Sequence, residues 1–383
     1  MRVLIMGGTR FSGRFFTERC IEKGWSVTLF NRGESNPELF GERVERLVGD
    51  RNSDAIEQLR DKTFDAVVDM CGQLPSHVER LARLLEPRVH RYLYISSISA
   101  YADGDPDNGE TPIAHRQTED APLTPFDGLG EEDEDDPMMH YAAFKAECER
   151  RILDVFGEGE RVTILRPGLI VGPHDPTERL TWWIRRAMRG GQIVAPSAPD
   201  QPVQCVDARA MADWMIAALE QNHSGTYHAV SPKEALTFDA LIETICDLCA
   251  PDDASLIRVP GDQLLEHELA PWAQVPLWLG GAPAGLLNLD PARIYGAGFD
   301  PPPIEETILA TMQWAKETPP PEDSRIGIPE AIEATYDAGV LSVRIGKSEA
   351  RQPRRIAVGS RTPDRRELSE GDGHATEAEV MEA

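Results

Sequence analysis

Residues 2–13, RVLIMGGTRFSG, decide the fold. The apolar run at 2–6 breaks into the glycine-rich turn 7–13, an amphipathic stretch follows to Gly24, and WSVTLFNRG then begins a second apolar run. A strand, a glycine turn, a helix and a second strand within about 30 residues predict a βαβ unit. The glycines permit close approach of the backbone to a pyrophosphate, and the helix N-terminus offers free N–H groups. We therefore expect a dinucleotide-binding turn here rather than a purely structural one.

The same alternation continues along the chain. Further strands are expected at 44–48, 66–71, 91–97 and 162–168, and helices at 53–61, 75–86 and 139–156. Alternating strands and helices predict an α/β fold, a Rossmann doubly wound parallel sheet.

Three regions are expected. Residues 1–172 read as the NAD(P)-binding Rossmann core, and 173–318 read mostly as a smaller C-terminal substrate-binding lobe. Residues 319–383 read as a linker and a largely disordered tail, although 328–339 could form one helix. The acidic stretch 102–137 reads as a long solvated loop or a lid over the site.

The ends of the strands supply the remaining cofactor contacts. The second strand ends in Asn31 and Arg32 where an NAD-binding fold commonly has an acid, and Arg10 lies within the turn. Both arginines could reach a 2′-phosphate, so NADP is slightly favoured over NAD, unless Arg32 is only an exposed strand end. Asp50 could bond the adenine amino group. The full predicted cofactor set is Gly7, Thr9, Arg10, Phe11, Gly13, Asn31, Arg32, Asp50, Cys71 and Gly72, together with Tyr141 and Lys145.

Tyr141 and Lys145 are four positions apart, which places them on one face of a helix. A nearby ammonium lowers the pKa of a phenol, so such a tyrosine can exchange a proton with a substrate oxygen. The segment 94–101, YISSISAY, ends the fifth strand and brings serine hydroxyls to the edge where doubly wound sheets bind ligands. A catalytic role is expected for the pair, against the alternative of a surface ion-pairing helix.

Four motifs together resemble an extended or atypical short-chain dehydrogenase/reductase of the NAD-dependent epimerase/dehydratase family: GGTRFSG at 7–13, YISSISAY at 94–101, YAAFK at 141–145 and RPGLIVGP at 166–173. The resemblance covers roughly residues 1–318. It implies Ser97, Tyr141 and Lys145 as the catalytic triad, with Ser96 and Ser99 as the other serine candidates. It also implies a homodimer.

The sequence departs from the family pattern at three places. Arg10 stands at the usual middle glycine, and the resulting GGTRF is similar to an atypical subgroup that includes chloroplast RNA-associated proteins. Ile98-Ser99 stands where sugar-nucleotide dehydratases carry an Asp-Glu pair, which disfavours 4,6-dehydration. The 44 positions between Ser97 and Tyr141 exceed the usual spacing because of the acidic stretch.

The expected activity is that of an NAD(P)-dependent oxidoreductase or epimerase acting on a carbinol or carbonyl carbon of a small polar substrate, a nucleotide-sugar by the resemblance. Ser99, Arg179 and Gln204 are candidate substrate contacts. The alternatives are an NADPH-dependent reductase of another small carbonyl compound and a non-catalytic RNA-associated protein.

The composition limits the expected binding partners and cellular location of the protein. A net charge of −26, with six lysines among 39 basic residues, disfavours nucleic-acid binding and fits a salt-loving host. The six cysteines are scattered along the chain, which argues against a disulfide framework. The sequence has no long apolar run that could form a membrane segment, and its N-terminus is unlike a signal peptide. We therefore expect a cytoplasmic enzyme. Cys246 and Cys249 form a lone C-x-x-C in a helix-like stretch, so no metal is expected.

Overall fold

The computed structural model describes residues 1–102, 118–130, 133, 138–157, 159–232, 235–281, 287–321, 326–328, 332–337 and 340–345. Residues 1–344 form one compact unit. Most of the predicted acidic loop and most of the predicted linker and tail lie outside the described residues.

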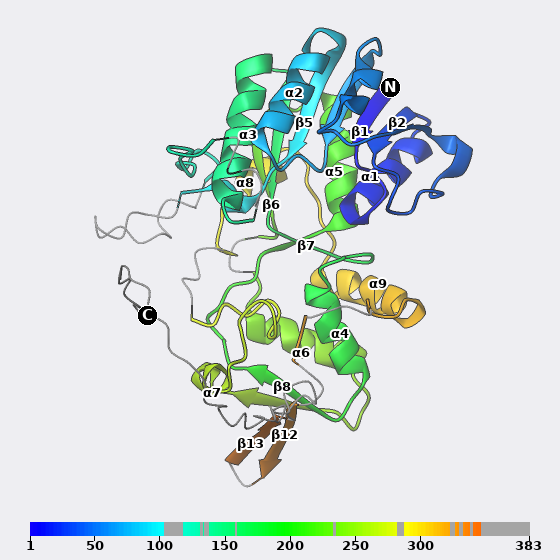
Figure 1. Cartoon of the computed structure of the whole chain (residues 1–383). Coiled ribbons are helices and arrows are strands. Elements are labelled where there is room, and N and C mark those ends of the chain that lie inside the picture. Colours follow the sequence, from blue (N-terminus) through cyan, green and yellow to red (C-terminus); the bar gives the residue numbers. More distant parts are fainter. Residues whose placement is uncertain are drawn as a thin grey trace, which may run out of the picture. The chain divides into compact units, whose positions relative to one another are not determined.

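A seven-stranded parallel sheet carries the N-terminal half of the chain, in the order β10-β6-β5-β4-β1-β2-β3 (Figure 1). Its strands are β1 (Arg2–Met6), β2 (Ser26–Asn31), β3 (Glu45–Val48), β4 (Phe64–Asp69), β5 (Val89–Ile95), β6 (Val162–Pro167) and β10 (Gly225–Ala229). The chain first builds outward from β1 to β3 and then restarts on the other side of β1 with β4. This reversal opens a crevice at the carboxyl ends of β1 and β4. The predicted doubly wound parallel sheet is confirmed.

Alternating side chains of each strand serve opposite faces of the sheet. In β1, Val3 and Ile5 join the core cluster under α1 (Phe11–Glu22) and α5 (Ala208–Gln221). Leu4 and Met6 join the cluster under α2 (Pro75–Leu85) and α3 (Tyr141–Phe156). A strand that is buried on both faces must be apolar throughout, which is the pattern the sequence shows.

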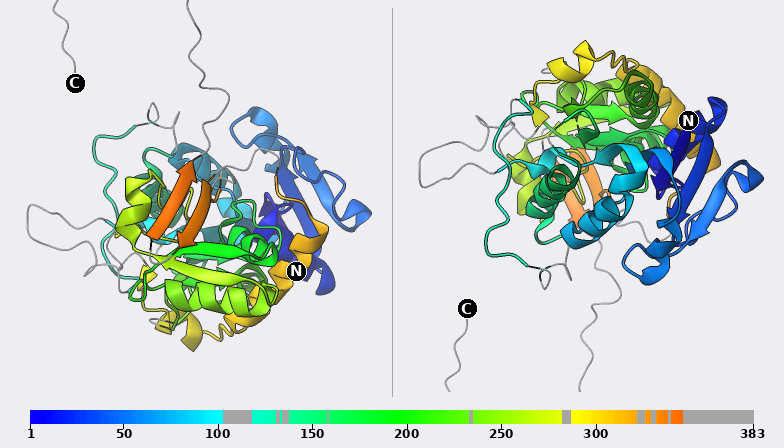
Figure 2. Two further views of the ribbon diagram at one scale, coloured as in Figure 1. Left: turned by 90° about the horizontal axis from the view of Figure 1, so that it is seen from below. Right: turned by 90° about the horizontal axis from the view of Figure 1, so that it is seen from above.

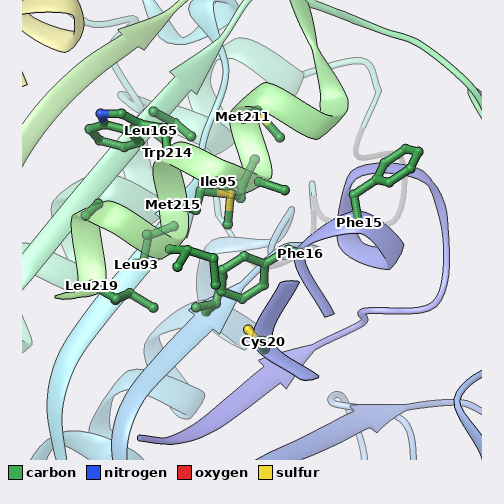
Figure 3. Close-up of a cluster of buried hydrophobic side chains, with 14 of the residues drawn as sticks. Phe15, Phe16, Cys20, Leu93, Ile95, Leu165, Met211, Trp214, Met215 and Leu219 are labelled. Atoms are coloured by element: carbon green, nitrogen blue, oxygen red, sulfur yellow. The ribbon is translucent and has the colours of Figure 1, made fainter. Parts of the chain in front are cut away.

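The face under α1 and α5 is drawn in Figure 3. Phe16 and Cys20 of α1 meet Met215 of α5 above Leu93 and Ile95 of β5. Helix α5 packs against α1, and β10 forms the last strand of the sheet next to β6. Residues 208–229 therefore belong to the Rossmann core, although they fall within the region predicted to be mostly the second lobe.

A second hydrophobic cluster lies within the region predicted as the smaller lobe. Its elements are α4 (Arg179–Met188), β8 (Gln192–Pro196), α6 (Phe238–Cys249), β11 (Ser255–Val259), α7 (Gly261–Glu266) and α9 (Ile304–Glu317). Strands β8 and β11 pair in parallel and lie next to α6 (Figure 2). Strands β7 (Leu169–Val171) and β9 (Cys205–Asp207) also pair, and α8 (Ala292–Gly296) contacts β10.

Two expected helices take other forms. The stretch predicted at 53–61 is a 3₁₀ helix, Asp54–Leu59, begun by the Ser53 side chain, which accepts a hydrogen bond from the Ala55 N–H. The helix expected at 328–339 is wrong, because the backbone there forms β12 (Ile332–Asp337), which pairs with β13 (Val340–Ile345). Ile, Thr and Tyr in this stretch favour a strand.

Cys246 and Cys249 lie half-buried on α6. Within the described ranges, no group of three or more His, Cys, Asp or Glu side chains is placed to hold a metal ion. No helix in the described part of the chain is long and apolar enough to cross a membrane.

Candidate functional site

A cavity of about 500 Å³ opens at the carboxyl ends of β1, β2, β3 and β4. Eight predicted cofactor residues line it: Gly7, Thr9, Arg10, Gly13, Asn31, Arg32, Asp50 and Cys71. The sequence did not single out other lining residues, among them Ser12, Glu34, Arg51, Asn52, Gln73 and His77. Phe11, Gly72, Tyr141 and Lys145 do not line the cavity, and Phe11 packs instead against the core cluster under α1.

The turn after β1 has a backbone that requires glycine. Gly7 and Gly8 have φ of 99° and 87°, a region that side-chain-bearing residues rarely adopt. A Cβ on Gly13 would lie 3.1 Å from Gly8 Cα, so α1 begins directly against the turn. Thr17 Oγ1 donates to Gly8 O at 2.9 Å, and Asn31 Nδ2 donates to Gly7 O at 2.9 Å. A glycine turn held in this way against a helix N-terminus fits a dinucleotide pyrophosphate.

The two arginines predicted for a 2′-phosphate have different surroundings. Arg32 forms an ion pair with Glu34 at 3.0 Å, and both side chains are 64% exposed. Arg10 is exposed, and its side chain makes no hydrogen bond or ion pair with another residue that the structure describes. The cavity therefore offers Arg10 as a cation whose charge no neighbouring carboxylate offsets.

Arg51 reaches the cavity from the end of β3 and is bound to a fully buried carboxylate. Its Nη1 and Nη2 lie 2.9 and 2.8 Å from Asp69 Oδ1 and Oδ2. The Tyr92 hydroxyl also donates to Asp69, at 3.0 Å. Burial alone would raise the pKa of Asp69, but the Arg51 charge and these hydrogen bonds outweigh it and hold the pKa below its usual value. An acid inside the buried run AVVDMC was the available signal, since it needs a partner.

Lys145 is buried, with 4% of its surface exposed. Its ammonium donates to Gly72 O at 2.8 Å, to Ile95 O at 2.7 Å and to the Tyr94 hydroxyl at 3.0 Å. Burial lowers the pKa of Lys145 below its ordinary value. Gly72 thus serves the site through its carbonyl, and a side chain there would collide with Asp69 Oδ2, at 2.8 Å.

The Tyr141 phenol and the Ser97 hydroxyl are close enough for the serine to affect the pKa of the phenol. Ser97 Oγ accepts a hydrogen bond from the Ser99 N–H at 3.1 Å, and its hydroxyl hydrogen and second lone pair stay available to other partners. Burial raises the pKa of Tyr141 above its ordinary value, and the Ser97 hydroxyl opposes that rise. The expected lowering of the phenol pKa by Lys145 is not seen, because the ammonium bonds to Gly72 and Ile95 instead.

The three candidate substrate contacts come from different segments of the chain. Ser99 is half-buried beside Ser97. Arg179 begins α4, and its guanidinium carbon lies 5.6 Å from the centre of the Trp272 ring. Gln204 is buried, and its amide bonds to backbone atoms of Ser231 and Leu289. A role in substrate binding stays a prediction for all three.

Comparison of the sequence with known families gives one match over more than half of the chain. The model described as "NAD dependent epimerase/dehydratase family" matches residues 3–230. The chloroplast stem-loop binding protein of 41 kDa b from Arabidopsis thaliana is 29% identical over 257 residues, which are 63% of this chain and 61% of that protein. The chain thus spans less than two thirds of the length of that relative.

Solved structures share the fold at low sequence identity. UDP-glucose 4-epimerase from Thermotoga maritima, with UDP-glucose, superposes with a TM-score of 0.60 at 15% identity, covering 83% of this chain and 99% of that one. UDP-glucose 4-epimerase from Thermus thermophilus, with NAD, gives a TM-score of 0.58 at 19% identity, covering 82% and 99%. These likenesses agree with the Rossmann sheet described above.

Proposed function

Because the chain belongs to the NAD dependent epimerase/dehydratase family, we propose that it is an NAD(P)-dependent enzyme that oxidises and reduces a carbinol or carbonyl carbon of a nucleotide-sugar. One observation carries the proposal. The Ser97 hydroxyl at the end of β5 and the Tyr141 phenol at the start of α3 come together beside the same sheet whose β1–α1 turn has the backbone of a dinucleotide site.

Each side chain has a defined task in this proposal. Tyr141 holds the proton that moves to or from the substrate oxygen, at its phenol oxygen. Ser97 donates to the phenol and orients the reacting oxygen of the substrate beside it. Lys145 fixes α3 against the carbonyls of Gly72 and Ile95. The chemistry that a bound nicotinamide supplies is acceptance and return of a hydride.

The substrate class rests on the family and on likeness. The two superposed structures are named UDP-glucose 4-epimerases. In an epimerase the dinucleotide stays bound between the two hydride transfers. In a reductase it exchanges with solvent, and the unpaired Arg10 at the cavity favours this variant with NADPH.

The first experiment identifies the dinucleotide. The purified protein is denatured and filtered, and any released nucleotide is identified by mass spectrometry. Stoichiometric NAD supports the epimerase, whereas an empty protein that binds NADPH more tightly than NADH supports the reductase. A protein that neither carries nor binds either dinucleotide overturns the proposal.

The second experiment tests the chemistry. The protein is incubated with a panel of UDP-sugars, with and without added dinucleotide, and the products are separated by chromatography. Tyr141→Phe should keep dinucleotide binding and lose turnover by about 10²- to 10⁴-fold, the usual contribution of a positioned acid or base. Loss of binding together with turnover would instead indicate a structural defect.

RNA binding is the second candidate, because the Arabidopsis relative is named as a stem-loop binding protein. The net charge of −26 opposes it, since phosphates would be repelled. Filter binding of a stem-loop RNA across a KCl series discriminates between the two. Tight binding that weakens steeply with salt would favour the RNA-associated protein over the enzyme.

A further inference from the structure

Glu149 lies one helical turn beyond Lys145 on α3 and is 1% exposed. Its carboxylate accepts two hydrogen bonds from Arg166 of β6, from Nε at 2.9 Å and from Nη2 at 2.5 Å. It also accepts a hydrogen bond from the hydroxyl of Ser96, the residue directly before Ser97. A buried carboxylate with this set of donors has one stable placement.

The backbone leaves the sheet at this point. The Ser96 N–H donates to Leu165 O at 2.8 Å, and Ser97 then begins the short 3₁₀ helix Ile98–Ala100. No strand pairing therefore holds Ser97 in register among the described residues. Two side chains of α3 contact the residues just before Ser97. Lys145 binds Ile95 O, and Glu149 binds the Ser96 side chain.

Arg166 extends this connection to the far side of the site. Its Nη1 donates to the Tyr101 hydroxyl at 2.7 Å and to Glu119 O at 2.9 Å. Tyr101 in turn contacts the ring of His228, on β10. The network thus ties α3 to Ser96, to β6 and, through Arg166, to Tyr101, and every member is buried.

We propose that Glu149 is a positioning residue, which sets the distance between Ser97 and Tyr141 by fastening α3 to Ser96 and Arg166. Lys145 and Glu149 hold two consecutive residues, Ile95 and Ser96, so the next residue along the chain meets Tyr141 of the same helix. The effect of Glu149 on turnover rests on the proposed function. Its effect on the distance between Ser97 and Tyr141 does not.

The effect on this distance is tested in the full-length protein without any substrate. Protein is labelled with [¹³Cζ]tyrosine, and the signal of Tyr141 is identified as the one missing from Tyr141→Phe. Ser97→Ala defines the chemical shift of the phenol when the Ser97 hydroxyl is absent. Glu149→Gln should move the signal most of the way to that value, and the double variant should move it no further than Ser97→Ala alone.

Glu147→Gln is the matched control. Glu147 is also buried on α3, but its carboxylate pairs with Arg150 and Arg151 of the same helix. This variant removes a buried charge from α3 without touching β5, so the Tyr141 signal should stay in place. A signal that stays in place in Glu149→Gln, while Ser97→Ala shifts it, overturns the proposal. So does an equal shift in Glu147→Gln.

Kinetics provide the second readout once a substrate is found. Glu149→Gln should lower kcat by ~10- to 100-fold with an unchanged KM for the dinucleotide. The substitution changes the position of Ser97 relative to Tyr141, which slows proton transfer, but it leaves the cavity beside the glycine turn unchanged. Unchanged kcat overturns the catalytic consequence. If no substrate or dinucleotide is found while the Tyr141 signal behaves as expected, the proposed function fails and the positioning role of Glu149 stands.

Discussion

The guanidinium of Arg51 and the carboxylate of Asp69 form a two-point ion pair at the cavity beside the glycine turn, with nitrogen–oxygen distances of 2.9 and 2.8 Å. Asp69 is fully buried at the end of β4, whereas Arg51 lines the cavity. Arg51 therefore forms part of the cavity wall, and Asp69 holds its guanidinium in a fixed position.

Replacing Arg51 with Met should destabilise the protein by about 3–5 kcal/mol at neutral pH, because an unpaired carboxylate would stay buried. The free energy of unfolding is measured by urea denaturation. Arg83→Met is the control, since Arg83 pairs with Glu79 on the exposed side of α2 and its loss should cost less than about 1 kcal/mol. Equal losses in both variants would contradict a special role for the buried pair.

The pH dependence of this difference has a defined sign. The folded-state pKa of Asp69 lies below its ordinary value, so its favourable contribution is present above about pH 4 and is lost as pH falls through the folded-state pKa. In Arg51→Met, burial raises the pKa of Asp69 because the arginine no longer opposes it. Protonation of the carboxylate then removes the free-energy cost of burying an unpaired charge. The gap in unfolding free energy between wild type and variant should thus narrow from pH 7 to pH 4. A gap that is constant with pH would show that the carboxylate is not its source.

Gly13→Ala should weaken dinucleotide binding by about tenfold or more, at a net stability cost of no more than about 2 kcal/mol. The new Cβ would press on Gly8 Cα at 3.1 Å and displace the turn, a strain of about 1–3 kcal/mol that is partly offset by the better helix propensity of alanine. Binding is measured by NADH and NADPH fluorescence. Gly24→Ala is the control. Its φ of 71° at the end of α1 makes alanine costly for stability, but nothing lies within 4 Å of it and binding should persist.

The fold could be predicted because its signals are local. The apolar runs that alternate between the two faces of the sheet, as Leu4 and Ile5 do, lie within single strands, and the glycine turn of residues 7–13 lies within one segment. The placement of Cys71 at the cavity followed from the same logic, since strand ends gather at one edge of a parallel sheet.

The partners of charged groups could not be predicted, because they come from distant parts of the chain. Lys145 was expected to act on Tyr141, four residues away, but bonds to Gly72, 73 positions away in sequence. Arg51 was missed because its partner Asp69 lies on another strand. Periodicity reports which face a residue occupies and says nothing of which side chain it meets there.

Gln204 tests whether a residue placed by sequence position also has the predicted contacts. It was predicted to bind substrate, yet its amide donates to Ser231 O and Leu289 O and accepts from the Leu289 N–H at 2.6 Å. Gln204→Ala leaves these buried groups without partners and should cost about 2–4 kcal/mol, with dinucleotide binding intact. Gln313→Ala removes one exposed amide contact on α9 and should cost little. Wild-type stability together with a raised KM for the sugar in Gln204→Ala would restore the role in substrate binding.

The choice between NAD and NADP should depend on Arg10 more than on Arg32. A 2′-phosphate gains most from a cation that has no other partner, and Arg32 already pairs with Glu34 in solvent. Arg10→Gln should weaken NADPH binding by about tenfold with a smaller effect on NADH, whereas Arg32→Gln should change either by less than about threefold. Glu34→Gln releases Arg32 and should strengthen NADPH binding. Dissociation constants for both dinucleotides across the three variants decide the matter, and an Arg10→Gln protein that binds NADPH like wild type would remove the structural reason for preferring NADP.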